Sequence, residues 1–203
     1  MLFKAASFFV LSFLIGGIPS GYLLFMLVKH ADIRDFGSGN IGFTNVARSA
    51  GAFLGAVVLI LDAGKAYLAV RLFSTFFEQE RIFMPIFGCA VIAGNILNPY
   101  LGFRGGKGVA TGLGACLAVS PVALLISLGV FGCALALSRY VSLGSLVASA
   151  SYLAVNAVFF ARRSVDLAAL LFAGAVLAAV SGSHASNIGR LMRGEENKIG
   201  KRR

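Results

Sequence analysis

The chain has 203 residues, of which 58% are hydrophobic and only 13% are charged. A soluble domain carries about a quarter charged residues, so this composition indicates a membrane protein. The net charge is +10, and the basic residues lie mostly outside the apolar runs. Positively charged cytoplasmic loops and their attraction to anionic lipid headgroups explain this charge without a nucleic-acid partner. We predict one integral-membrane domain over residues 1–203, surrounded by membrane lipid.

Six apolar runs follow one another along the chain. A transmembrane helix needs about 20 residues, and five of the runs fit one crossing each. The fourth run is too long for one helix and contains Pro121, which predicts two short helices that turn near 124–128. The runs are approximately 5–28, 51–72, 82–100, 109–138, 141–160 and 165–183.

Basic residues outside these runs predict the topology. They occur in 29–50, in 101–108 and in the tail from 184, which ends in Lys201, Arg202 and Arg203. The positive-inside rule places all three stretches in the cytoplasm. We therefore predict an all-α polytopic fold of about seven spans, with the N-terminus outside and the C-terminus cytoplasmic. Five or six spans remain alternatives.

The first polar stretch runs from Gly37 to Arg48. Its glycines allow backbone amides to approach an oxyanion closely, and Arg48 can bind a phosphate through two parallel hydrogen bonds. A Gly/Asn-rich turn is the alternative. The candidate binding residues here are Gly37, Ser38, Gly39, Asn40, Gly42, Thr44, Asn45 and Arg48.

The second polar stretch is Gly105-Gly106-Lys107-Gly108, which enters a helix at about Val109. It lacks the residue spacing and the preceding strand of a nucleotide-binding P-loop. Amides at a helix start, the helix dipole and a lysine nevertheless favour a phosphate. A basic cytoplasmic turn is the alternative.

The third polar stretch begins at His184. If the last helix continues through it, His184 and Asn187 lie on one face, three residues apart. Asp62 and Lys65 have the same spacing within an apolar run, where charges are costly unless paired. We expect these two to pair with each other; lining a polar site is the alternative.

Together the three stretches resemble the motifs of the acyl-phosphate:glycerol-3-phosphate acyltransferase family. Residues 37–48 are similar to Gly-Ser-Gly-Asn-x-Gly-Ala-Thr-Asn-x-x-Arg, residues 105–111 match Gly-Gly-Lys-Gly-Val-Ala-Thr, and residues 184–196 resemble His-Arg-x-Asn-Ile-x-Arg-Leu-x-x-Gly-x-Glu. The segment 139–145 and the Asp62/Lys65 spacing are also similar. The departures are Phe43 for Ala, Ala185 for Arg, and Asn95 where members commonly carry His.

The resemblance implies transfer of a fatty acyl group from acyl phosphate to the 1-hydroxyl of glycerol 3-phosphate, which yields lysophosphatidic acid for phospholipid biosynthesis. It also implies a multi-pass protein of the bacterial plasma (inner) membrane with a cytoplasmic active site, and the soluble enzyme that makes acyl phosphate as a partner. Because an acyl phosphate is already activated, we expect no cofactor and no metal. A small transporter or channel for a phosphorylated solute is the alternative.

The site residues can then be given roles. We expect catalysis to involve Lys107, His184, Arg48 and Ser38, with Arg48 and Lys107 holding phosphate. Substrate binding is assigned to Gly37, Gly39, Asn40, Gly42, Thr44, Asn45, Gly105, Gly106, Ser145 and Asn187. His184 or a substrate phosphate takes the hydroxyl proton. This assignment requires Arg48, Lys107 and His184 to serve one pocket.

Overall fold

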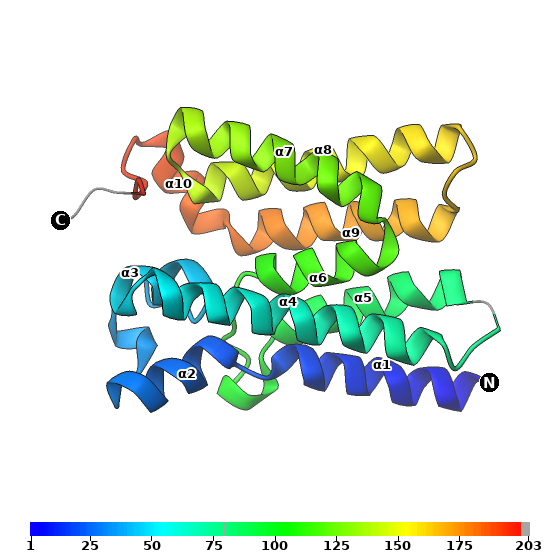
Figure 1. Cartoon of the computed structure of the whole chain (residues 1–203), viewed down its shortest axis with the longest axis horizontal. Coiled ribbons are helices and arrows are strands. Elements are labelled where there is room, and N and C mark those ends of the chain that lie inside the picture. Colours follow the sequence, from blue (N-terminus) through cyan, green and yellow to red (C-terminus); the bar gives the residue numbers. More distant parts are fainter. Residues whose placement is uncertain (79, 200–203) are drawn as a thin grey trace. The chain divides into compact units, whose positions relative to one another are not determined.

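The computed structural model describes residues 1–78 and 80–199, and in these ranges every regular element is a helix (Figure 1). The predicted all-α fold class is therefore confirmed. Five helical segments are long and apolar enough to cross a membrane, and a bent pair at residues 167–192 makes up to six. The shorter apolar helix Val109–Val119 would be needed to reach seven, although its 11 residues are fewer than a span requires. The five segments are Leu2–Lys29, Ala52–Ser74, Arg81–Leu101, Pro121–Ser138 and Val141–Ala161.

The helices form two compact units, Met1–Val119 and Ser120–Arg203. In the first unit α1 packs along α5, and α4 contacts α3, α5 and α6. Its elements are α1 (Leu2–Gly17), α2 (Ser20–Lys29), η1 (Ile33–Asp35), α3 (Phe43–Ala50), α4 (Ala52–Ser74), α5 (Glu80–Ile96), η2 (Pro99–Leu101) and α6 (Val109–Val119). That residues 1–203 act as one domain remains a prediction.

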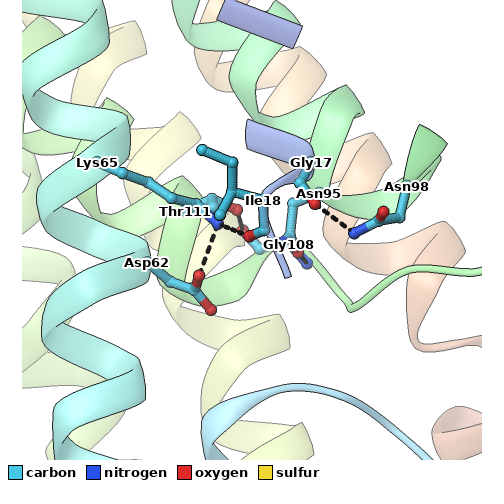
Figure 2. Close-up of polar contacts among 8 residues, drawn as sticks. All are labelled: Gly17, Ile18, Asp62, Lys65, Asn95, Asn98, Gly108 and Thr111. Carbon is cyan, nitrogen blue, oxygen red and sulfur yellow. Dashed lines mark hydrogen bonds and ion pairs between the residues drawn. The ribbon is translucent and has the colours of Figure 1, made fainter. Parts of the chain in front are cut away.

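The first apolar run is broken rather than straight. α1 ends at Gly17 and α2 begins after Pro19, because proline has no amide to continue the helical hydrogen bonds. The carbonyl of Gly17 accepts a hydrogen bond from Asn98 Nδ2 at 2.6 Å, and Lys65 Nζ donates to the carbonyl of Ile18 (Figure 2). Lys65 of α4 and Asn98, which lies between α5 and η2, therefore satisfy backbone groups that the break exposes.

Asp62 and Lys65 form the ion pair that their spacing predicts. Lys65 Nζ lies 2.7 Å from Asp62 Oδ1, and the two side chains are only 13% and 7% exposed. Because Lys65 also bonds to the backbone of Ile18, the pair joins α4 to the break between α1 and α2.

The long run 109–138 does form two helices, but the predicted turn near 124–128 is wrong. α6 ends at Val119 and α7 (Pro121–Ser138) continues through 124–128. The break falls at Ser120 because Pro121 occupies the first helical position, where its missing amide costs nothing and its ring fixes a helical φ.

The second unit contains α7, α8 (Val141–Ala161), α9 (Leu167–Ser183) and α10 (Ala185–Met192), and α8 packs against both α7 and α9. The last helix does not continue straight through His184, so the condition for the shared face of His184 and Asn187 is not met: α9 and α10 meet there at an angle of 63°. Beyond α10, the amide of Ile199 donates to the carbonyl of Arg139 at 2.9 Å. Lys201, Arg202 and Arg203, on which the tail-charge prediction partly rests, lie outside the described residues.

Candidate functional site

The side chain of Asn45 organises the glycine-rich loop of the first unit. Asn45 is the third residue of α3, is only 2% exposed, and its side chain bonds back to the loop. Its Oδ1 accepts the amide of Ser38 at 2.9 Å, and its Nδ2 donates to the carbonyls of Phe36 and Asn40, each at 2.9 Å. One side chain thus replaces the backbone pairing that an irregular loop lacks.

Gly37 is required beside this amide. Its φ of +59° lies in the left-handed region, and a Cβ on it would lie 2.2 Å from Asn45 Oδ1. Three residues on, Asn40 Oδ1 accepts the amide of Gly42 at 2.9 Å. Asn40 and Asn45 therefore shape the loop, and a direct contact of either with phosphate stays a prediction.

The loop leads into α3, which presents two of the candidate binding groups. Thr44 lies in the first turn of α3 and Arg48 one turn later, so the two share a face. Arg48 and Ser38 are exposed, as groups that meet a substrate from outside must be. The first-turn amides of a helix lack intrahelical acceptors, and the helix dipole there attracts anions.

The second loop is held by the end of α5. The amide of Gly105 donates to the carbonyl of Ile96 at 3.1 Å, and the amide of Gly106 donates to the carbonyl of Asn95 at 3.0 Å. A Cβ on Gly105 would lie 1.9 Å from the Asn95 carbonyl oxygen, so only glycine fits. The half-buried Lys107 follows in this tightly bound segment.

The two loops lie next to each other within the first unit. A Cβ built on Gly106 would lie 3.6 Å from Cγ1 of Ile41, in the middle of the glycine-rich loop. The carbonyl of Ile41 in turn faces Gly21 of α2 at close range. Segments that are some 60 residues apart in the sequence are thus neighbours, which a shared phosphate-binding surface requires.

His184 occupies the bend between α9 and α10 in the second unit and is 2% exposed. Its Nδ1 lies 2.8 Å from the carbonyl oxygen of Val180. Because a carbonyl only accepts hydrogen bonds, Nδ1 carries a proton, and in the neutral imidazole Nε2 then holds the lone pair. This tautomer makes Nε2 a hydrogen-bond acceptor for a hydroxyl group.

Asn187 and Arg190 share one carboxylate, that of Glu196. Asn187 Nδ2 donates to Oε1 and Arg190 Nε to Oε2, each at 2.8 Å. The Glu196 side chain is only 7% exposed. Glu196 belongs to the third motif, but the sequence does not predict it as a site residue, because nothing in a nine-residue separation indicates that the chain folds back onto α10.

Ser145 lies in α8 with its side chain buried, and its hydroxyl donates to the carbonyl of Val141 at 3.0 Å. α10 packs against α8 and the tail reaches Arg139, so the segment 139–145 and the third motif are close in the second unit. Among residues 1–78 and 80–199, no three His, Cys, Asp or Glu side chains are grouped to hold a metal. That Arg48, Lys107 and His184 serve one pocket remains a prediction.

Comparison with known proteins identifies the family. The family model described as glycerol-3-phosphate acyltransferase matches residues 6–194. The glycerol-3-phosphate acyltransferase of Desulforamulus reducens is 42% identical over 95% of this chain and 94% of its own length, and that of Chlorobaculum tepidum is 34% identical over 94% of both.

Solved structures agree with this match. The crystal structure of PlsY (YgiH), an integral membrane glycerol 3-phosphate acyltransferase, in its glycerol 3-phosphate form is 34% identical with a TM-score of 0.88, covering 97% of this chain and 96% of that one. The lysophosphatidic acid form is 32% identical with a TM-score of 0.86, covering 97% and 95%. These likenesses extend over nearly the whole chain, which belongs to the glycerol-3-phosphate acyltransferase family of integral membrane enzymes.

Proposed function

We propose that this protein transfers a fatty acyl group from acyl phosphate to the 1-hydroxyl of glycerol 3-phosphate, with lysophosphatidic acid and inorganic phosphate as products. The observation that carries the proposal is the contact between the two glycine loops, which places Gly106 beside Ile41. Both substrates carry a phosphate, and these loops supply backbone amides together with Arg48 and Lys107. The match to glycerol-3-phosphate acyltransferases favours this activity over a transporter.

The reaction needs no further activation. The 1-hydroxyl oxygen attacks the acyl carbonyl carbon, a C–O ester bond forms, and the bond between that carbon and the phosphate oxygen breaks. We assign to Lys107 and Arg48 the stabilisation of the negative charge that develops on the phosphoryl group and on the tetrahedral oxyanion. Ser38 is assigned to the same catalytic group. Positioning and charge stabilisation of this kind are the usual main terms of catalysis.

His184 and Asn187 are assigned to glycerol 3-phosphate. Nε2 of His184 accepts the hydrogen bond of the 1-hydroxyl, because Nδ1 is committed to Val180. The departing phosphate takes the hydroxyl proton and leaves as inorganic phosphate. Glu196 holds Asn187 through a 2.8 Å hydrogen bond and so fixes the direction of its amide.

The site is assigned to the cytoplasmic face of the bacterial plasma (inner) membrane. Positive charge in 29–50 and 101–108 supports this, since two candidate spans, Ala52–Ser74 and Arg81–Leu101, separate these stretches and return the chain to the same side. Glycerol 3-phosphate and a soluble enzyme that makes acyl phosphate would reach the site from there.

The test uses the purified full chain in detergent with labelled glycerol 3-phosphate. Palmitoyl phosphate should yield labelled lysophosphatidic acid and equimolar phosphate, whereas palmitoyl-CoA should yield neither. Lys107→Gln is the matched control, because it keeps a polar side chain only one bond shorter and removes the charge. Equal rates with both donors would contradict the choice of acyl phosphate, and no product with either would contradict the reaction.

A further inference from the structure

Asn95 is the residue on which the Lys107 loop is built. Its backbone carbonyl accepts the amide of Gly106 at 3.0 Å, and its side-chain Oδ1 accepts the amide of Gly108 at 3.1 Å (Figure 2). These are the amides immediately before and after Lys107. A single residue at the end of α5 therefore holds the glycines on both sides of the lysine.

Asn95 acts inside the protein rather than on a ligand. Its side chain is 6% exposed, and Oδ1 would lie 2.8 Å from a Cβ on Gly106, so the amide packs directly beneath the loop. The neighbouring residue Ile96 binds Gly105 in the same way, which makes the end of α5 a template for the loop.

We infer that Asn95 is a positioning residue for Lys107: its Oδ1 sets the loop conformation in which the ammonium group meets the phosphoryl group. The inference rests on the proposed function of Lys107. It also explains how an asparagine can stand at position 95, where members of the family commonly carry histidine. Nδ1 of a histidine lies the same number of bonds from Cα as Oδ1 of an asparagine, so either side chain can accept the Gly108 amide.

The test compares three substitutions at one position by steady-state kinetics. Asn95→Leu keeps the branched shape but has no acceptor, whereas Asn95→Asp and Asn95→His each keep an acceptor at the δ position. We expect kcat/KM for glycerol 3-phosphate to fall about 10- to 100-fold in Asn95→Leu, because misplacement of a catalytic group by about 1 Å has that effect. Asn95→His should stay within roughly threefold of the wild type, because its Nδ1 keeps an acceptor for the Gly108 amide.

Asn98 provides a matched control. It is as buried as Asn95 and only three residues away, yet its side chain bonds to Gly17 and Tyr100 instead of the loop. Asn98→Leu should lower the melting temperature while the folded enzyme retains its kcat/KM. An equal loss of kcat/KM in Asn98→Leu would assign the effect to the α1–α5 junction and overturn the inference.

Hydrogen exchange of a peptide covering 104–109 gives a readout that does not require an active variant. In the wild type the amides of Gly106 and Gly108 should exchange slowly, and Asn95→Leu should accelerate exchange at Gly108, whose side-chain acceptor it removes. Fast exchange in the wild-type loop, or a folded Asn95→Leu with wild-type kcat/KM, would overturn the inference. If Asn95→Leu does not fold, the folded variants Asn95→His and Asn95→Asp provide the test, because both keep an acceptor. Loss of activity in both of them would overturn the inference. A wild-type enzyme that is inactive with acyl phosphate would instead contradict the proposed function.

Discussion

Lys65 donates a hydrogen bond to the carbonyl of Ile18, 47 residues earlier, while it pairs with Asp62 in its own helix. This relationship predicts a large effect of removing the ammonium group. Lys65→Met leaves the buried Asp62 carboxylate without its cation and the Ile18 carbonyl without its donor, and we expect the free energy of unfolding to fall by about 3 kcal/mol or more. Thermal unfolding in detergent measures this loss. Lys29→Met, at an exposed position, is the control and should be near neutral; equal melting temperatures for both variants would contradict the prediction.

Substitution of Asn45 should disorder the glycine-rich loop. Asn45→Ala removes the acceptor of the Ser38 amide and the donor to the carbonyls of Phe36 and Asn40, which we expect to cost about 1–3 kcal/mol and to raise the KM for the phosphorylated substrates. Asn45→Asp should not rescue activity, since a carboxylate cannot donate to the carbonyls of Phe36 and Asn40. The control is Asn156→Ala, which removes a buried asparagine bonded to Tyr152 in the second unit. A KM that changes no more in Asn45→Ala than in this control would argue against the loop role.

The tautomer of His184 leads to a prediction about proton transfer. If the departing phosphate takes the proton, His184→Gln should keep turnover within about tenfold of the wild type at saturating substrate, because glutamine can still accept a hydrogen bond. A general base typically contributes 10²- to 10⁴-fold, so a loss in that range would show that His184 is the base. Turnover is measured against pH in both proteins, and an unchanged pH profile supports the phosphate.

Two adjacent glutamates allow a sharp comparison in the third motif. Glu196→Gln leaves Arg190 without its carboxylate, and we expect a loss of about 1–2 kcal/mol together with a higher KM for glycerol 3-phosphate. Glu195 pairs with Arg193 where both side chains are about 60% exposed, so Glu195→Gln should change little. The comparison would fail if both variants behaved alike in melting temperature and KM.

The loop before α3 should lose a small contribution to stability in acid. The Arg34 side chain donates to the Asp32 carboxylate and lowers the pKa of Asp32 from its ordinary 3.8. The contribution is therefore present above the unfolded value of 3.8 and is lost as the pH falls through the lower folded value. At pH 7 the free energy of unfolding of the wild type should exceed that of Asp32→Asn by less than about 1 kcal/mol, because the Asp32–Arg34 pair is exposed. The difference in melting temperature should vanish as the pH approaches 2, and a difference that grew in acid would contradict it.

The sequence predicts the parts of this protein that depend on local chemistry. The apolar runs indicate the membrane helices, and the i, i+3 spacing of Asp62 and Lys65 indicates their pairing, because both follow from helix geometry and the cost of burying charge. The break before Pro121 was also available from sequence, since proline favours the first position of a helix. The break lies at Ser120, a few residues before the predicted turn at 124–128.

The remaining features depend on contacts between distant residues. Nothing local indicates that Asn98 binds Gly17, that Glu196 folds back to Asn187, or that Asn95 supports Gly108. Asn45 illustrates the limit within a single motif. An amide in a glycine-rich stretch can bind a phosphate or the loop itself, and only the fold shows that it bonds to the backbone of 36–40.

The broken first helix also imposes an order on biogenesis. Residues 2–29 leave the ribosome before Lys65 and Asn98 have been made, and at roughly 5–20 residues per second the delay reaches several seconds. In that interval the carbonyls of Gly17 and Ile18 lack the side chains that satisfy them in the finished protein. The break that Pro19 causes therefore precedes the partners of its exposed carbonyls, which Lys65 and Asn98 supply only once the later segments lie beside it.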